Sequence, residues 1–171
     1  MTVFETERLT AREWRVDDAA AAYEIYRDPD VVRFLGTTPQ PVASVAEQRQ
    51  RVERWIGVTE SLRGTGYGQW ALETHDGTLV GMALLKPLPD AAEVEVGWHL
   101  GKPFWGSGYA TEGARGAIAH GFTVCGLNVI YAVVVAENEA SAAVAGRLGM
   151  HHEGSTDRYY DRRLELYSIR P

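Results

Sequence analysis

A glycine turn in the middle of the chain has the residue types and spacing of an anion-binding site. Residues 104–113 read Phe-Trp-Gly-Ser-Gly-Tyr-Ala-Thr-Glu-Gly, and an alanine-rich helix is expected to begin at about Gly108. Gly106 and Gly108 can adopt positive φ and let a ligand approach the main chain closely. The unpaired N–H groups of the first helical turn then point at that ligand. The turn therefore predicts a phosphate-binding site.

Polar side chains on the preceding segment are the second chemical feature. Glu93, Glu95 and His99 lie two or four residues apart, so a strand over 93–100 would place them on one face. The other face is apolar and consists of Val94, Val96, Trp98 and Leu100. Charged groups on a central strand are costly unless something uses them. These polar residues are therefore candidates for the chemistry of the site.

Two common nucleotide-binding motifs do not fit the glycine turn. A dinucleotide fingerprint needs a third glycine and an acidic residue about twenty residues further on. Thr111 and Asn128 stand at those places. A Walker loop ends in Gly-Lys-Ser or Gly-Lys-Thr, and the sequence contains neither tripeptide. The turn must therefore bind another kind of phosphate ligand.

The elements that position these residues follow from hydrophobic periodicity. We predict helices over 18–27, 108–123 and 139–148, and another in which Val45, Val52, Trp55 and Ile56 recur on one face. The predicted strands are 6–14, 69–74, 79–85, 93–100, 129–135, 151–156 and 164–169. This mixed order indicates an α+β fold, a twisted sheet with helices on both faces.

Local residues set several of these boundaries. Asp17 is expected to cap the first helix, which stops before Pro29. Asp76-Gly77 predicts a hairpin between two strands. The continuous β-branched run 129–135 is typical of a strand covered on both sides.

Length and composition indicate one folded domain. With 171 residues, 45% of them hydrophobic, and no repeat or linker, we expect a single domain over residues 1–171. A net charge of −6 without a large basic cluster argues against nucleic acid as a partner. The longest uncharged run, 116–136, is too polar to span a bilayer, and the charged N-terminus is unlike a signal peptide. We therefore expect no membrane contact and a cytoplasmic location.

Cysteine and histidine usage gives no support to a metal site. Cys125 is the single cysteine, which excludes an intramolecular disulfide and leaves a cysteine-ligated zinc site without enough ligands. We interpret it as a buried small hydrophobe, not as a nucleophile. His151 and His152 would project to opposite faces of a strand, which argues against joint metal binding. No metal is predicted.

Ordered motifs along most of the chain resemble one enzyme family. They are Glu7-Arg8-Leu9, Asp28-Pro29-Asp30-Val31, Phe34-Leu35-Gly36, Val96-Gly97-Trp98-His99-Leu100, Trp105-Gly106-Ser107-Gly108-Tyr109-Ala110-Thr111-Glu112, Asn138-Glu139-Ala140-Ser141, Leu148-Gly149-Met150 and Glu153-Gly154. These motifs are similar to those of the GNAT N-acetyltransferases, in particular the RimJ/RimL-like branch. The resemblance implies a GNAT-like α+β fold whose mixed, largely antiparallel twisted sheet has about seven strands, with helices on both faces.

The same resemblance implies acetyl-CoA as the acetyl donor. Its pyrophosphate would lie on the turn made by Trp105, Gly106, Ser107, Gly108, Tyr109, Ala110 and Thr111. Its pantetheine arm would follow the strand end at Trp98, His99 and Leu100, held by Asn138. Convergent N–H donors and a helix dipole suit a diphosphate. The wider family pattern has Arg or Gln where Trp105 stands, and Asn138 is equally suited to capping a helix.

Acetyl transfer from a thioester to an amine requires a neutral amine and a proton for the departing thiolate. We predict Glu95 as the base, acting directly or through a water, with Glu93 as the second choice. The structural alternative for Glu95 is pairing with an arginine at the sheet edge. His99 has a suitable pKa, about 6.5. We nevertheless expect it to contact the cofactor through its main chain, with its ring turned to solvent.

The proton donor is predicted from the resemblance. Many GNAT enzymes use a tyrosine seven residues after the motif asparagine, and that position here is Ala145. The RimJ/RimL-like branch carries Asn-x-x-Ser, so the resemblance implies that the Ser141 hydroxyl protonates or hydrogen-bonds the CoA sulfur. A hydroxyl that bonds back to the main chain is the alternative. Glu112 is expected to be structural or a minor site residue, because an acidic residue favours the first turn of a helix in any case.

The sequence leaves the amine acceptor open between a protein N-terminus and a small molecule. Four aromatic residues are possible lining of its groove, although core packing is the preferred interpretation: Phe34, Trp55, Tyr67 and Trp70. Three residues of the last loop could contact it, although a solvated loop is preferred: Tyr159, Tyr160 and Arg162. Our hypothesis is direct attack of the amine in a ternary complex. A non-catalytic acyl-CoA sensor or interaction module on the same fold is the alternative, and a homodimer is left open.

Overall fold

Short β-branched and aromatic segments, separated by turns, form an eight-stranded sheet in the computed structural model, which describes residues 1–36 and 38–171. Only β5 and β6 pair in parallel; every other neighbouring pair is antiparallel. This confirms the expected α+β class and largely antiparallel sheet. The strands, in spatial order, are β1 (Thr2–Glu5), β2 (Leu9–Glu13), β3 (Gly68–Thr74), β4 (Leu79–Pro87), β5 (Val94–Leu100), β6 (Ile130–Val134), β8 (Leu164–Ile169) and β7 (His151–Thr156).

The sheet has one strand more than the sequence predicted. The prediction began the first strand at Thr6, whereas β1 precedes it and pairs with β2, with Phe4 opposite Ala11. Its 4 residues are too few to show a pattern. They are extended because β2 offers an open edge and because Phe4 packs edge-on against Trp70, with ring centroids 5.7 Å apart.

The predicted hairpin joins β3 and β4 and sets the register of the strands beside it. Gly77 at its turn has a φ of 87°, and Asp76 accepts a hydrogen bond from the Thr78 N–H at 3.1 Å. The strand β4 in turn pairs with β5, so that Lys86 stands opposite Glu95. A correctly predicted turn thus helps to bring two charged side chains together.

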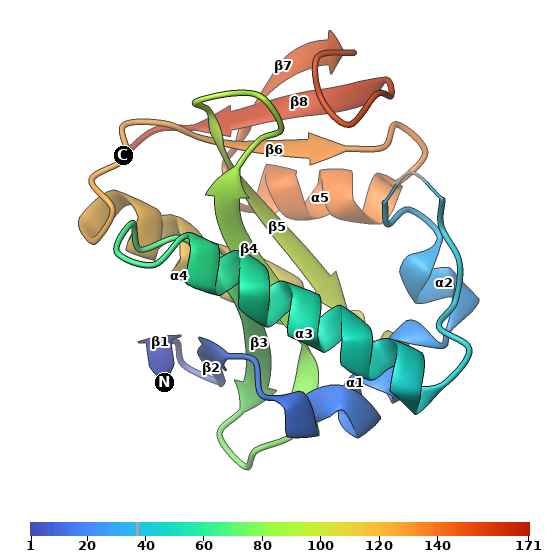
Figure 1. Ribbon diagram of the computed structural model, residues 1–171. Helices are drawn as coiled ribbons and strands as arrows, with labels where there is room; N and C mark the ends of the chain where they lie inside the picture. The colour runs from blue at the N-terminus through green and yellow to red at the C-terminus, as the bar shows by residue number, and fades with distance from the viewer. Residues whose placement is uncertain (37) are drawn as a thin grey trace.

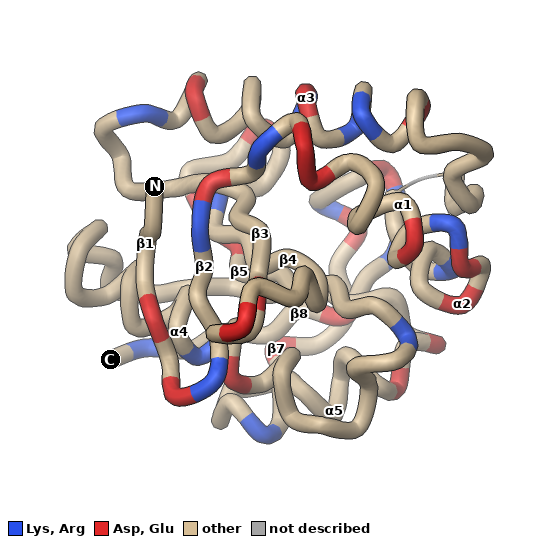
Figure 2. The backbone as a smooth tube through the Cα atoms, turned by 90° about the horizontal axis from the view of Figure 1, so that it is seen from below, with Lys and Arg blue, Asp and Glu red and all other residues tan. Residues whose placement is uncertain are grey.

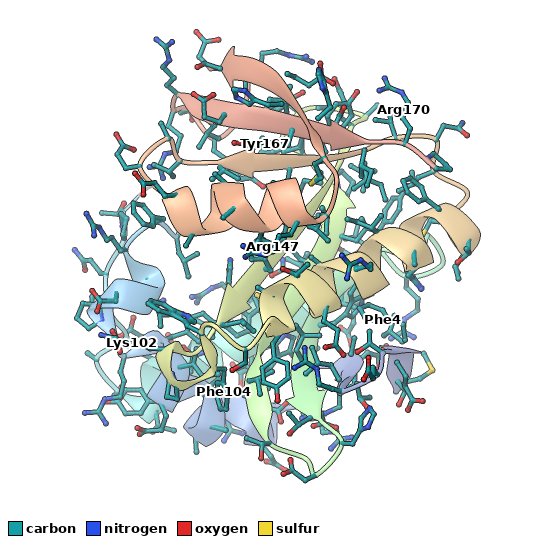
Figure 3. The ribbon with its side chains drawn as sticks, turned by 180° about the vertical axis from the view of Figure 1, so that it is seen from behind. Phe4, Lys102, Phe104, Arg147, Tyr167 and Arg170 are labelled. Atoms are coloured by element: carbon teal, nitrogen blue, oxygen red, sulfur yellow. The ribbon has the colours of Figure 1, made fainter. Side chains whose placement is uncertain are left out.

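Helices cover both faces of the sheet, as predicted (Figures 1 and 3). The helices α1 (Ala19–Tyr26), α2 (Pro29–Val32) and α3 (Val45–Ser61) lie on one face, and α4 (Tyr109–Thr123) and α5 (Glu139–Arg147) lie on the other. Each face has its own apolar core. Trp14, Ile25, Tyr26, Val52 and Met82 belong to the first, and Leu72, Leu85, Ala114, Ala117 and Ile130 belong to the second.

Small residues allow α4 to lie close to the sheet. A Cβ at Gly113 would stand 2.6 Å from the Leu72 side chain, and one at Gly121 would stand 2.7 Å from Ile130. Larger residues would push the helix away. This close packing fixes the start of α4 beside the end of β5.

The start of α1 differs from the prediction. Asp17 does not cap the helix, because Val16–Asp18 form a short 3-10 turn and α1 begins at Ala19. Asp18 accepts two hydrogen bonds from the buried Arg12, at 2.8 and 2.9 Å, and one from the Arg15 N–H at 2.7 Å. These partners hold the carboxylate away from the helix end. The predicted stop before Pro29 is confirmed.

Most charged side chains of α3 are exposed, and Figure 2 marks their positions along the helix in blue and red. Ion pairs of 3.3 and 3.4 Å link Arg51 to Glu47 and Arg49 to Glu53. Val45 was wrongly placed on the packed face: it is the first residue of the helix and is 44% exposed. None of the described helices combines the length and apolarity needed to cross a membrane.

Candidate functional site

A cavity of about 1140 Å³ opens where β5 and β6 diverge (Figure 1). The two strands share one parallel pair, Glu95 with Tyr131, so β5 has no strand partner on that side beyond this pair, and its Leu100 carbonyl accepts a hydrogen bond from the Trp105 indole at 2.9 Å. The cavity lies between these strands, the first residues of α4 and α5, and parts of the segments 30–36 and 160–164. Its half-buried Val133 also shows that β6 is not covered on both sides, contrary to the prediction.

The glycine turn has the predicted conformation. Gly106 and Gly108 have φ of 76° and 83°, and α4 begins at the next residue. A Cβ at Gly106 would meet nothing within 4 Å. The first-turn N–H groups of α4 are thus accessible to an anion. Of the turn residues predicted to bind the cofactor, those that line the cavity are Trp105, Gly106, Gly108, Tyr109, Ala110 and Thr111.

Ser107, in contrast, does not line the cavity. Its main chain is bound by Arg8 instead. The Arg8 guanidinium donates to the Ser107 carbonyl at 2.9 Å and pairs with Glu112 at 2.6 Å. Burial acts to raise the pKa of Glu112, but hydrogen bonds from Thr6 and Arg8 outweigh it and hold that pKa below its ordinary value. Glu112 is therefore a structural anchor of the turn, as expected. The role of Arg8 was missed.

The start of α5 brings Asn138 and Ser141 to the cavity. The Asn138 side chain accepts a hydrogen bond from the Ser141 N–H at 3.1 Å, so it caps the helix while lining the cavity. Within the described residues the Ser141 hydroxyl makes no hydrogen bond, so the back-bonded alternative does not apply. Arg147 donates to the Thr111 hydroxyl at 3.2 Å across the gap between α5 and α4 (Figure 3). This places an unpredicted positive charge beside the turn.

Glu95 is the centre of a buried polar cluster at the cavity wall. Its side chain is 8% exposed and pairs with Lys86 at 2.6 Å. Tyr160 donates to the same carboxylate oxygen, and the Lys86 ammonium lies 2.6 Å from the Tyr160 hydroxyl. The partners are thus a lysine and a tyrosine, not the arginine that the alternative assumed. Lys86 was missed, although a lone charge on an otherwise apolar strand was a usable signal.

The last loop lies against the cavity, so the preferred interpretation of a solvated loop is wrong. Tyr160 and Arg162 line the cavity, and Arg162 donates to the Gly36 carbonyl at 2.8 Å. Tyr159 is 2% exposed and faces Glu93 instead, with 3.3 Å between hydroxyl and carboxylate. The sheet order places this loop over the start of β5. No local sequence pattern shows that long-range placement.

His99 is half-buried beneath α1, so the expectation of a ring turned to solvent is wrong. Its Nδ1 lies 3.4 Å from the Tyr26 hydroxyl, and the two rings meet edge to face. Burial, with a smaller contribution from the Lys86 charge, lowers the pKa of the imidazole to about 4. The ring is therefore neutral at physiological pH. The main chains of Trp98, His99 and Leu100 nevertheless run along the cavity, as predicted.

Most of the remaining candidate residues do not line the cavity. Glu93 lies outside the cavity and pairs with Arg158 at 2.8 Å. A hydrogen bond from its own N–H and another from Arg158 lower the pKa of its carboxyl group. Among the aromatic candidates Phe34 lines the cavity, whereas the others pack in the two cores, as preferred: Trp55, Tyr67 and Trp70.

Three comparisons with known proteins agree with this geometry. Residues 8–151 match the family model described as acetyltransferase (GNAT) domain. The protein p20 of Bacillus licheniformis, an uncharacterized N-acetyltransferase, is 28% identical over 170 residues, 99% of this chain and 93% of p20. A GNAT-family acetyltransferase structure from Bacillus anthracis superposes with a TM-score of 0.81 at 24% identity, covering 99% and 98% of the chains. RimL, a ribosomal L7/L12 alpha-N-protein acetyltransferase solved with coenzyme A, gives 0.80 at 18% identity over 99% and 98%.

Proposed function

The chain belongs to the GNAT acetyltransferase family, and from that premise we propose that it moves the acetyl group of acetyl-CoA to a primary amine by direct attack in a ternary complex. The observation that carries the proposal is one cavity that joins an open anion-binding turn, Gly106 to Thr111, to a buried carboxylate, Glu95. A diphosphate-bearing donor needs an anion-binding site, and an amine acceptor needs a base close to that site.

The donor end of the cavity fits acetyl-CoA. The turn before α4 offers main-chain N–H groups, and Arg147 adds a positive charge beside Thr111. The edge of β5 at Trp98, which has no strand partner on the side of β6, suits the amides of a pantetheine arm, and Asn138 lines the same cavity. Ser107 would support the turn through its bond to Arg8 without lining the cavity.

Acetyl-CoA supplies the acetyl group as a thioester. The substrate ammonium first loses a proton, the amine nitrogen then bonds to the carbonyl carbon, and the carbon–sulfur bond breaks. The nitrogen loses a second proton, and the thiolate gains one to leave as free CoA thiol. The sum is one ammonium and one thioester giving one amide, one thiol and one proton, with no acetyl-enzyme.

Two side chains are proposed to move these protons. Glu95 receives the proton of the substrate ammonium, directly or through a water, because it is buried at the cavity wall and one of its oxygens has no partner within the described residues. Ser141 donates to the CoA sulfur, because its hydroxyl lines the same cavity and makes no other hydrogen bond among those residues.

The acceptor is proposed to be a primary amine, either a protein N-terminus or a small molecule. The likeness in fold to RimL, named for acetylation of a ribosomal protein, supports testing protein N-termini. The cavity lined by Phe34, Tyr160 and Arg162 supports testing small amines as well. A homodimer is compatible with either acceptor.

Release of CoA thiol from acetyl-CoA, measured over a panel of small amines and N-terminal peptides, tests the function. We expect Glu95→Gln to lower kcat about 10²- to 10⁴-fold, the usual range for a general base. The matched control is Glu60→Gln, which makes the same change on an exposed carboxylate of α3. Tight acetyl-CoA binding without turnover on any amine would favour the acyl-CoA sensor. Full turnover in Glu95→Gln and Ser141→Ala would instead contradict the roles proposed for these two side chains.

A further inference from the structure

The proposed reaction gives no role to the Tyr160 side chain, although its hydroxyl donates a hydrogen bond to the proposed base, Glu95. We propose that Tyr160 is a positioning residue, which holds the Glu95 carboxylate in place for proton transfer from the acceptor amine. The proposal rests on the proposed function, since it assigns a role beside the proposed base.

The contacts of Tyr160 are directed at one oxygen of Glu95. Its hydroxyl donates to Oε1, which also accepts from Lys86 at 2.6 Å. Two donors on one oxygen restrict rotation of the carboxylate. The other oxygen, Oε2, has no hydrogen-bond partner within residues 1–36 and 38–171 and is left to accept a proton from the substrate. Tyr160 thus acts through Glu95 and not on the substrate.

The Tyr160 hydroxyl remains a donor throughout the working pH range. Burial raises the pKa of its phenol strongly, and the negative charge of Glu95 raises it further. A phenol that keeps its proton is a poor acid but a dependable hydrogen-bond donor. This chemistry fits a positioning role and not that of the proton donor to the CoA sulfur.

The backbone is held in an uncommon conformation to present this side chain. Tyr160 and Asp161 have φ of 60° and 50°, in the left-handed region that non-glycine residues rarely occupy. Such residues persist only where the surroundings fix them, and they cluster at functional sites. Here the next residue, Arg162, ties the loop to the Gly36 carbonyl at 2.8 Å. The loop is therefore fastened to another part of the cavity wall, with Tyr160 lining the cavity.

A neighbouring tyrosine provides a matched control. Tyr159 lies in the same loop and also donates to a carboxylate, but its partner is Glu93, which lies outside the cavity. Tyr159→Phe and Tyr160→Phe each remove one tyrosine hydroxyl that donates to a glutamate. The two glutamates, Glu93 and Glu95, lie two residues apart in the sequence. A purely structural role predicts similar effects of the two changes.

The test compares these variants with Glu95→Gln and with the double variant Tyr160→Phe/Glu95→Gln. We expect Tyr160→Phe to lower kcat about ten- to hundredfold, because a hydrogen bond to a charged group is lost. The KM for acetyl-CoA and its calorimetric Kd should stay within about twofold. Tyr159→Phe should leave kcat unchanged. In the Glu95→Gln background Tyr160→Phe should cost less than about twofold, since its target is already gone.

Four results would overturn the inference. They are equal kcat in Tyr160→Phe and wild type, equal losses in both tyrosine variants, multiplicative losses in the double variant, and a thermal unfolding scan in which Tyr160→Phe alone is unfolded. Failure of the proposed function is recognised separately: wild type then releases no thiol with any amine, and the inference falls with it.

Discussion

Lys86 places one positive charge between two titratable side chains of the cavity. It pairs with Glu95 at 2.6 Å, and its charge adds to burial in lowering the pKa of His99 to about 4. An imidazole with that pKa is no stronger a base than an ordinary carboxylate. The advantage that an unperturbed histidine would have at neutral pH is lost. At the residue scale the structure therefore favours Glu95 over His99 as the base.

The lowered pKa of His99 also predicts how stability depends on pH. Below pH 6.5 the unfolded chain protonates His99, whereas the folded protein does so only near pH 4. The free energy of unfolding should therefore fall as the pH falls through this window, by up to ~3 kcal/mol. Urea unfolding of His99→Gln between pH 7 and pH 4 should show a flatter pH dependence than wild type.

His75→Gln is the control, because His75 is exposed in the β3–β4 turn. That variant should follow the wild-type pH dependence. If His99→Gln and His75→Gln respond to pH alike, the imidazole of His99 is not buried as described.

At the scale of elements, the features predicted from sequence are those set by local residues. Asp76-Gly77 predicted the β3–β4 hairpin, and Gly106 with Gly108 predicted the turn before α4, since positive φ is a local requirement. The contact between Tyr160 and Glu95 could not be predicted from local residues. Tyr160 meets Glu95 because β8 lies between β6 and β7, an arrangement set by long-range pairing. Arg8 was missed for the same reason, as its partner Glu112 is far along the chain.

The turn before α4 should be sensitive to any side chain at Gly106. Its φ of 76° is strained for every L-residue, although a Cβ there would touch nothing within 4 Å. Gly106→Ala should lower the free energy of unfolding by ~1–2 kcal/mol. Because the turn must shift to relieve that strain, the KM for acetyl-CoA should rise about tenfold. Thermal unfolding and steady-state kinetics measure the two effects.

Gly146 in α5 is the matched control. It also has open space at its Cβ, but φ is not positive there. Gly146→Ala should raise the stability by ~0.5–1 kcal/mol and leave the KM unchanged. An unchanged KM in Gly106→Ala would mean that the turn does not bind the donor.

At the scale of the whole molecule, one sheet carries both apolar cores and the cavity. Buried residues of β4 belong to each core, Met82 to one and Leu85 to the other. This shared strand supports the proposal that residues 1–171 form a single domain. The cavity opens at the parallel pair β5–β6, where the largely antiparallel sheet divides.

The net charge of the whole protein is negative, whereas the charged residues that line the cavity are mostly basic. The chain has a net charge of −6, yet four basic residues line the cavity against Asp30 and Glu95: Arg33, Lys86, Arg147 and Arg162. A basic lining suits a phosphate-rich donor more than it suits a polycationic acceptor.

The most direct measurement of the central claim is a product balance. Wild type and Glu95→Gln are incubated with acetyl-CoA and an amine from the panel, and acetylated amine, free thiol and the intact protein are quantified by mass spectrometry. We expect acetylated amine and thiol in equal amounts for wild type, strongly reduced formation of both in Glu95→Gln, and no acetylated protein as an intermediate. Thiol release that does not depend on the amine, or an acetylated protein that passes its acetyl group to the amine, would contradict the proposed reaction.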